Sequence, residues 1–475
     1  MLIVDLDHSL IKSDLLHEAL FEGLAHAPGE TLRAASRLGD GIAAFKSAMT
    51  ELCRVPPEDL PYNQEVLDYI KAHRAAGGKA ALVSGSDQRM VRKIADYLGL
   101  FDEAFGSTAD RNLTGARKAG FLKERYGEGA FDYVGDSKKD LKVWAVSRGA
   151  VTVGASEEFK AAAQAAAPSV PAVHLSPPPG AREWVSAVMS AVRPHQWMKN
   201  MLVFLPVLAA QQTRWEVWFD AIMAFVVFSL TASSVYLLND LLDLTADRAH
   251  PRKRFRAMAS GRLRVLHGAL LAPGLLLTAV VLALCFLPLQ FLGVMAFYYV
   301  ATLAYSFSLK RKLVIDICTL AGLYSLRVLA GSEAMGLYIS PWTLAFTSFL
   351  FLSLAAIKRQ AELVDGLRRG KDRASGRAYE VDDLPIVAMM AVASGYVSVL
   401  VLALYASSPE VQMLYTSPLM LWAACPVLLY WISRMAMLAH RGWMTDDPLV
   451  FAMRDPISLF SASAILAIGS AGNWL

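Results

Sequence analysis

The sequence contains little cysteine and little net charge. Its four cysteines lie far apart among 475 residues, at Cys53, Cys285, Cys318 and Cys425, and three of them stand in apolar runs. This spacing excludes a disulfide framework and a cysteine-based metal site. The formal net charge is only +4, and the chain has no basic tail and no alternation of aromatic and basic residues. These absences exclude the common patterns of nucleic-acid binding.

The first residues do not follow the pattern of a secretory leader. The chain starts with four apolar residues, Met1 to Val4, and turns acidic at Asp5. A signal peptide needs a basic start and a longer apolar region. We therefore expect the N-terminal domain to stay in the cytoplasm.

Hydrophobic residues, in contrast, are abundant. They make up 55% of the chain, and the mean hydropathy is +0.38. Both values exceed soluble usage, so part of the chain lies in a bilayer. The apolar stretches after about residue 184 predict an all-α polytopic membrane domain over residues 184–475. We expect about nine transmembrane helices, at Val185–Ala210, Val217–Leu238, Leu266–Phe286, Leu289–Phe307, Val314–Met335, Pro341–Ile357, Leu384–Ala406, Pro418–Met437 and Pro456–Leu475.

Lysine and arginine crowd alternate loops of this domain. The basic loops are Arg248–Arg264, Lys310–Lys312, Lys358–Arg377 and the loop that holds Arg434 and Arg441. By the positive-inside rule these loops are cytoplasmic. We therefore expect a multi-pass protein of a bacterial-type inner (plasma) membrane, with its active sites on the cytoplasmic side.

Residues 1–155 follow a different pattern, in which short apolar runs alternate with helical segments. The runs are Leu2–Leu6, Lys79–Val83, Phe131–Val134 and Ala150–Val153. The alternation predicts an α/β, Rossmann-like domain with a parallel sheet and with catalytic residues at the carboxyl ends of its strands. We expect a small helical cap at about residues 13–62, and a surface linker in the Ala/Pro-rich residues 156–183.

Polar residues follow the predicted strands. Asp5 and Asp7 stand two residues apart at the first strand end, so both can face one pocket. Ser84 follows the second run, Lys118 stands further along the chain, and Asp136 follows the third run. These motifs, in this order, resemble the haloacid-dehalogenase-like phosphohydrolase superfamily.

The resemblance implies a role for each of these residues. Asp5 would be the nucleophile that becomes an aspartyl-phosphate, and Asp7 the acid that protonates the leaving oxygen. Ser84 and Lys118 would hold the phosphoryl group. Asp136, with Asp5 and the backbone carbonyl of Asp7, would bind Mg²⁺. We expect an active phosphatase domain rather than a degenerate regulatory one.

The stretch Asn239–Arg256 is a second candidate site. If its first half is helical, Asn239 and His250 share one face with three carboxylates, those of Asp240, Asp243 and Asp247. Carboxylates this close repel one another unless a cation lies among them, and Mg²⁺ beside a polyphosphate prefers such oxygen ligands. We therefore expect the three aspartates to bind Mg²⁺ and to act in catalysis.

Basic residues follow these carboxylates directly. Pro251 ends the helix, and the cations after it are Arg252, Lys253, Arg254 and Arg256. Metal ligands on one turn and phosphate-binding cations on the next suit a bound diphosphate. The alternative is an ordinary charged loop between two membrane helices, but the order of carboxylates and then cations favours a site.

Charged residues at membrane depth are further candidates for substrate binding. Arg327 lies inside a predicted span, where an ionisable side chain costs on the order of several kcal/mol unless it is paired or solvated. Asp316 precedes it by about three turns, so both lie on roughly one face. The other candidates are Lys310, Lys312, Lys358 and Arg359. The alternative for each is a snorkelling or solvated charge.

The series from Arg193 to Asn200, followed by the aspartate motif, resembles the UbiA-type prenyltransferase superfamily of nine-helix membrane enzymes. This resemblance covers about residue 185 to the C-terminus and adds Lys199 to the substrate-binding candidates. Usual members hold a prenyl diphosphate with Mg²⁺ between two acidic motifs. Here the second region, Tyr305–Asp316, carries one acid and three bases. A donor with an additional phosphate would explain the extra cations, and Tyr305 joins the candidates for binding it.

This variant looks like the decaprenyl-phosphate phosphoribosyltransferase branch, which transfers phosphoribose from phosphoribosyl pyrophosphate to a polyprenyl phosphate. The resemblance implies a Mg²⁺-dependent substitution at the anomeric carbon. The N-terminal domain would then remove the 5-phosphate, which gives polyprenyl-phosphoryl-ribose, a precursor for arabinose-containing cell-wall polymers.

Two other readings stay open. The chain could be an aromatic-ring prenyltransferase that uses a prenyl diphosphate, with a fused phosphatase of separate substrate. It could also be a lipid-binding or transport protein with a cytoplasmic regulatory domain. A homo-oligomer is open in every case.

Overall fold

The computed structural model describes the backbone of the whole chain except residues 54, 109–110, 371–376, 409–410, 412–416, 445–446 and 475. The chain divides into two compact units. Unit 1 comprises Met1–Val192 and Tyr236–Ala272, and unit 2 comprises Arg193–Val235 and Pro273–Leu475. The predicted aspartate site, at residues 239–256, therefore belongs to the same unit as the N-terminal residues.

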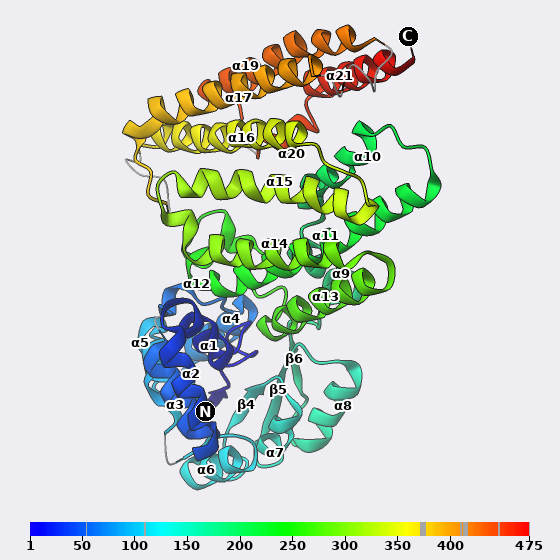
Figure 1. The fold of residues 1–475 in the computed structure, drawn as a ribbon. Helices are drawn as coiled ribbons and strands as arrows, with labels where there is room; N and C mark the ends of the chain where they lie inside the picture. Colours follow the sequence, from blue (N-terminus) through cyan, green and yellow to red (C-terminus); the bar gives the residue numbers. More distant parts are fainter. Residues whose placement is uncertain are drawn as a thin grey trace. The chain divides into compact units, whose positions relative to one another are not determined.

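A six-stranded sheet forms the centre of unit 1 (Figure 1). Its spatial order is β3-β2-β1-β4-β5-β6, and every neighbouring pair is parallel. The strands are β1 (Leu2–Val4), β2 (Ala80–Asp87), β3 (Glu103–Ser107), β4 (Asp132–Gly135), β5 (Gly149–Val153) and β6 (Val173–Leu175). The predicted parallel α/β architecture is confirmed, with β1 central between β2 and β4.

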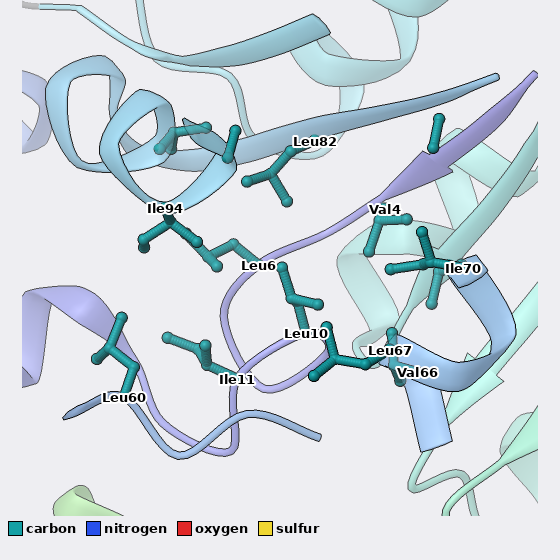
Figure 2. Packing of buried hydrophobic residues seen from close by; sticks show 14 of the residues in the cluster. Val4, Leu6, Leu10, Ile11, Leu60, Val66, Leu67, Ile70, Leu82 and Ile94 are labelled. Carbon is teal, nitrogen blue, oxygen red and sulfur yellow. The ribbon is translucent and has the colours of Figure 1, made fainter. Parts of the chain in front are cut away.

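Helices cover this sheet and share its core. They are α4 (Gln64–Ala75), α5 (Gln88–Leu98), α6 (Ala116–Tyr126), α7 (Leu141–Trp144) and α8 (Glu157–Ala166). Helix α5 starts at Asp87, whose side chain accepts from the Arg89 N–H, and ends at Gly99 in the left-handed conformation (φ 62°). Its Ile94 packs with Leu6 and Leu82 in the core shown in Figure 2. Burying each such side chain stabilises the fold by about 1.5–3 kcal/mol.

A group of short helices stands where the sequence predicts a cap. These are α1 (Leu15–His26), α2 (Pro28–Ser36), η1 (Arg37–Asp40), α3 (Ile42–Leu52) and η2 (Pro57–Asp59). Asp14 caps α1 by accepting from the backbone N–H groups of Leu16 and His17. A small separate core, which includes Ala19 and Met49, holds the helices together.

Part of the predicted linker is ordered sheet and helix. Residues 157–175 form α8 and the edge strand β6, in which Val173 pairs with Val151 of β5. Alanine has the highest helix propensity, so an alanine-rich run forms a helix when one of its faces can be buried, as Ala163 is here. The following helix, α9 (Ala181–Val192), also belongs to unit 1.

Long apolar helices make up most of the remaining chain. Within the described residues, seven helical segments are long and apolar enough to cross a membrane. The elements are α11 (Trp215–Leu242), α13 (Val265–Phe286), α14 (Leu289–Phe307), η6 (Leu309–Arg311), α15 (Ile315–Met335), α16 (Pro341–Arg368), η7 (Val381–Asp383), α17 (Leu384–Ala406), η8 (Pro418–Ala423), α19 (Ala424–His440), α20 (Pro448–Ala452) and α21 (Pro456–Trp474).

The first of the nine predicted spans differs from the expectation. The segment Val185–Ala210 is not one helix: α9 ends at Val192, and a 3₁₀ segment, η4 (Pro194–Phe204), leads into α10 (Leu205–Ala209). The break follows from Arg193, which is left-handed (φ 57°), and from Pro194, whose ring prevents a continuous helix. The last predicted span, Pro456–Leu475, corresponds to helix α21 over Pro456–Trp474.

Candidate active sites

The carboxyl ends of three neighbouring strands carry the predicted phosphatase residues. Asp5 comes directly after β1, Asp136 comes directly after β4, and Ser84 lies in β2. Because β2, β1 and β4 are adjacent and parallel, the sheet brings these side chains to one edge.

Asp5 is held by a buried lysine. Its Oδ1 accepts hydrogen bonds from Lys118 Nζ at 2.8 Å and from Leu6 N at 2.9 Å. Lys118 also donates to the hydroxyl of Tyr133 at 2.8 Å. Burial alone would lower the pKa of Lys118, but the charges of Asp5 and Asp140 raise it, so the ammonium stays charged. Both of these hydrogen bonds use Oδ1 of Asp5.

Asp7 has the surroundings of an acid catalyst. Its Oδ1 accepts from Leu15 N at 2.9 Å, and its Oδ2 accepts from Ser86 Oγ at 2.6 Å and Ser84 Oγ at 3.3 Å. Burial, together with the charge of Asp14, raises the pKa of Asp7 to about 7. A large share of this carboxyl therefore carries a proton at neutral pH, as donation to a leaving oxygen requires.

The same edge of the sheet offers ligands for a divalent cation. Carboxylate oxygens of Asp5, Asp136 and Asp140 lie within 4.8 Å of one another. Burial and the charge of Asp5 raise the pKa of Asp136 to about 8. A bound cation would offset the repulsion between these carboxylates. Asp140 also accepts hydrogen bonds from the Tyr133 hydroxyl at 2.9 Å and from Ser137 Oγ at 2.8 Å. These bonds fix the position of its carboxylate. The residues present fit Mg²⁺.

Sequence reasoning missed two residues of this site. Ser86 stands two positions after Ser84 on β2, and strand periodicity could have placed it on the same face. Tyr133 lies inside an apolar run that reads only as strand core, so the sequence carried no signal for its bonds to Lys118 and Asp140.

The aspartate stretch is helical, as predicted, with a short break. Helix α11 ends at Leu242, and α12 (Leu244–Ala249) begins after Asp243. Helical backbone bonds continue across the break, from Asp243 N to Asn239 O at 2.8 Å and from Asp247 N to Asp243 O at 2.7 Å. The half-buried side chains of Asn239 and Asp243 lie on this turn.

Two of the three aspartates converge on one cation. Nη1 of Arg256 lies 3.1 Å from Asp240 Oδ1 and 2.5 Å from Asp247 Oδ2. Lys253 Nζ is 3.9 Å from the other oxygen of Asp247. Carboxylates and cations therefore share one site, as the residue order predicts.

The aspartate site has a buried oxygen that suits a metal ion. Oδ1 of Asp247 is buried and accepts no hydrogen bond from the described residues. An unsatisfied buried carboxylate oxygen is costly unless a cation compensates it. Among the described residues, however, the acidic side chains whose oxygens all lie within 4.8 Å of one another are those of Asp5, Asp136 and Asp140. The carboxylates of Asp240, Asp243 and Asp247 are therefore spread more widely.

The remaining residues of this stretch shape or flank the turn. Nδ1 of His250 accepts from the backbone N–H groups of Arg252 and Lys253, at 3.1 and 3.2 Å, so it holds the turn after Pro251. The exposed Arg254 lies over the ring of Phe255, with 4.9 Å to its centroid.

In unit 2, two predicted lysines share one carboxylate. Lys199 Nζ and Lys358 Nζ lie 2.9 and 2.8 Å from Oδ2 of Asp447. The hydroxyl of Tyr324 donates to the same carboxylate at 2.9 Å. No local pattern pairs Asp447 with these lysines, because Lys358, the nearer of the two, lies 89 positions away along the chain.

Asp316 is enclosed by arginines. Its side chain is fully buried and forms ion pairs with Arg359 at 2.7 Å and Arg377 at 2.9 Å. Tyr305 also donates to Asp316, at 2.9 Å. Glu362 pairs with both arginines and completes the network.

Arg327 has neutral hydrogen-bond partners. Its Nε donates to Asn200 and its Nη2 to Tyr298, each at 2.9 Å, and its Nη1 donates to the carbonyl of Leu323. The buried guanidinium thus joins three segments of unit 2. Of the other two candidates, Lys310 is half-buried and Lys312 is exposed.

Comparison with known proteins supports both halves of this description. Residues 200–461 match the UbiA prenyltransferase family, and residues 2–144 match the haloacid dehalogenase-like hydrolases. An uncharacterized protein of Sinorhizobium fredii, y4nM, is 38% identical over 98% of this chain and 89% of its own length.

Two further relatives cover the membrane part. A decaprenyl-phosphate phosphoribosyltransferase of Mycolicibacterium smegmatis is 42% identical over 201 residues, which are 41% of this chain and 63% of the relative. The solved structure of a UbiA homolog from Archaeoglobus fulgidus, bound to GPP and Mg²⁺, is 14% identical with a TM-score of 0.45, over 61% of this chain and 100% of that chain. With the UbiA match, the apolar helices indicate an integral membrane protein. This chain therefore belongs to the UbiA prenyltransferase family and carries a haloacid dehalogenase-like hydrolase domain at its N-terminus.

Proposed function

We propose that this enzyme transfers 5-phosphoribose from phosphoribosyl pyrophosphate to a polyprenyl phosphate, and that its N-terminal domain removes the 5-phosphate. The product is polyprenyl-phosphoryl-ribose, which would serve as a precursor for arabinose-containing polymers. The similarity to decaprenyl-phosphate phosphoribosyltransferases over 201 residues supports this choice of donor and acceptor.

The proposal depends most on the ion pairs that Asp316 forms with Arg359 and Arg377. A prenyl diphosphate enzyme of this family uses a second acidic motif, and Asp316 is the acid that remains in that region. Because Arg359 and Arg377 both neutralise it, Asp316 has little capacity left for a metal ion. One acidic site and a surplus of cations suit phosphoribosyl pyrophosphate, which carries a pyrophosphate and a separate 5-phosphate.

The transferase residues act by electrostatics. Asp240, Asp243 and Asp247 would hold Mg²⁺, which when bound neutralises charge on the departing pyrophosphate. Lys253 and Arg256 lie next to these carboxylates and would bind phosphate oxygens. A lipid phosphate oxygen attacks the anomeric carbon as the bond from that carbon to the pyrophosphate oxygen breaks. The attacking phosphate is already anionic near neutral pH, so no general base is needed.

Unit 2 has a further pair of basic groups that could bind a phosphate. Lys199 and Lys358 both lie beside Asp447, which holds the two ammonium groups close together. We propose that this pair binds a substrate phosphate.

The phosphatase residues then act on the 5-phosphate. Oδ2 of Asp5 attacks phosphorus, the bond from phosphorus to the ribose O5 breaks, and Asp7 donates its proton to O5. Water next hydrolyses the aspartyl-phosphate, and Asp7 accepts a proton from that water. The ammonium of Lys118 balances the charge of Asp5 throughout.

The fusion places both reactions in one chain, on the cytoplasmic side of the membrane in this proposal. A shared chain raises the effective concentration of the lipid product at the phosphatase site.

The test of the proposed function is a comparison of two donor substrates. Membranes that contain the protein should transfer label from phosphoribosyl pyrophosphate to a polyprenyl phosphate and should transfer none from a prenyl diphosphate to an aromatic acceptor. The reverse result would contradict the proposal.

A further inference from the structure

A buried ion pair joins the N-terminal helices to the aspartate stretch. Nη1 and Nη2 of Arg248, on α12, donate to the two carboxylate oxygens of Glu18, on α1, at 2.8 and 2.6 Å. The side chains are 3% and 0% exposed. Both residues belong to unit 1. The pair therefore has the two-pronged geometry that makes an arginine–carboxylate contact strong and directional.

Neighbouring polar contacts reinforce this pair. The hydroxyl of Thr245, on α12, donates to Glu22 on α1 at 2.6 Å. Ser13 donates to Glu18 from the start of the cap. Two successive turns of α1 thus contact two positions on α12.

Arg248 also fixes the turn that follows the basic residues. Its Nε donates to the carbonyl of Ala259 at 3.0 Å. Ala259 is buried, and so are its neighbours Ala257, Met258 and Leu263. One guanidinium therefore connects α1, α12 and this turn.

The same turn packs closely on the N-terminal domain. Gly261 has a left-handed backbone (φ 74°), and a Cβ at this position would lie 2.6 Å from Cβ of Lys12. A side chain does not fit there, so glycine is needed both for the conformation and for the close approach.

These contacts surround the proposed metal ligands. Asp247 directly precedes Arg248 in the chain, and Arg256 stands three residues before Ala259. The ion pair between Asp247 and Arg256, at 2.5 Å, thus lies between two anchor points that Arg248 supplies. Loss of one partner from a buried pair leaves an uncompensated charge, which is strongly destabilising.

We propose that Glu18 is a positioning residue for the transferase: the phosphatase domain supplies a buried carboxylate that holds the aspartate stretch in its working geometry. This inference rests on the proposed function for its kinetic readout. It assigns the fusion a structural role beyond proximity, because the transferase then depends on the fold of the phosphatase domain and not on phosphatase catalysis.

The test compares Glu18→Gln, Arg248→Gln and the double variant in the full-length protein. Each single variant should raise the KM for phosphoribosyl pyrophosphate with Mg²⁺ by about tenfold, within the roughly 5- to 150-fold range of couplings between sites. Because the residues act as a pair, the double variant should lose no more than Arg248→Gln alone. Hydrolysis of p-nitrophenyl phosphate should stay within about twofold of the parent, since Glu18 contacts no phosphatase residue named above.

A readout that needs no transferase activity separates this inference from the proposed function. Amide hydrogen exchange in residues 244–250 should be slow in the parent and faster in Glu18→Gln. If the parent transfers no phosphoribose while this exchange difference holds, the proposed function fails and the structural anchor stands. Unchanged exchange and an unchanged KM would overturn the inference. Loss of p-nitrophenyl phosphate hydrolysis with normal transfer would overturn it as well, because Glu18 would then serve only its own domain.

Discussion

The carboxylate of Asp316 lies 2.7 Å from the guanidinium of Arg359, and both side chains are fully buried. This pair occupies the region where a prenyl diphosphate enzyme of the family would present a second acidic motif. Arg377 also pairs with Asp316, at 2.9 Å, so two guanidinium groups already balance this single carboxylate. The transferase chemistry that we propose therefore has one acidic site and several phosphate-binding cations.

Replacing Arg359 by glutamine should destabilise unit 2 strongly. The change leaves Asp316 buried beside a single remaining arginine, Arg377, and such a loss costs about 3–5 kcal/mol. Thermal unfolding in detergent measures the effect. The matched control is Arg369→Gln, which removes a partly exposed pair with Asp365 near the end of the same helix and should cost no more than about 1 kcal/mol. Equal losses in the two variants would contradict the role we give to Asp316.

Replacing Asp5 by asparagine should stop the phosphatase and spare the transferase. Without the nucleophile, hydrolysis should fall by at least about 10³-fold, and the 5-phosphorylated lipid should accumulate. Mass spectrometry of the extracted lipids measures this. Asp68→Asn, at an exposed position on α4, is the control and should behave as the parent does. An unchanged lipid product in the Asp5 variant would mean that the phosphatase has another substrate.

Replacing Asp247 by asparagine should weaken the use of Mg²⁺. This change removes a charge from a buried carboxylate that has an unsatisfied oxygen. We expect the Mg²⁺ concentration for half-maximal transfer to rise by at least about tenfold. A titration of transferase rate against Mg²⁺ measures this, with the exposed Asp96→Asn on α5 as the control. The same Mg²⁺ requirement in both variants would remove Asp247 from the metal site.

The thiol of Cys53 should react slowly with alkylating agents near neutral pH. Burial raises its pKa to about 11, so the thiol is protonated and unreactive at pH 8. Alkylation by iodoacetamide should be slow at pH 8 and should accelerate about tenfold per pH unit as the thiolate fraction rises. Peptide mass spectrometry after timed alkylation gives the rate. A fast reaction at pH 8 would contradict the raised pKa of this thiol.

The central strands of unit 1 could be predicted because their runs are short, apolar and followed by polar motifs. The run Leu2–Leu6 gave β1 and placed Asp5 at its end. Strand β3 was missed because Glu103–Ser107 contains a charge, a glycine and a serine, which hide its apolar character. Strand β6 was missed because it lies in a segment whose alanine and proline content resembles a linker.

The candidate residues could be predicted better than their partners. Periodicity placed Asp240 and Asp247 on one face, and residue order placed Arg256 near them. No local pattern predicts that Glu18 meets Arg248, because the two positions are 230 residues apart. Pairings of this kind depend on how the whole chain folds.

The most direct test of the account is transfer of labelled phosphoribose to a polyprenyl phosphate by membranes that contain the full-length protein. With Mg²⁺ present, the parent should move label into the organic phase as polyprenyl-phosphoryl-ribose, and Asp243→Asn should move essentially none. Absence of label in the organic phase with the parent, or equal transfer by the Asp243 variant, would contradict the account.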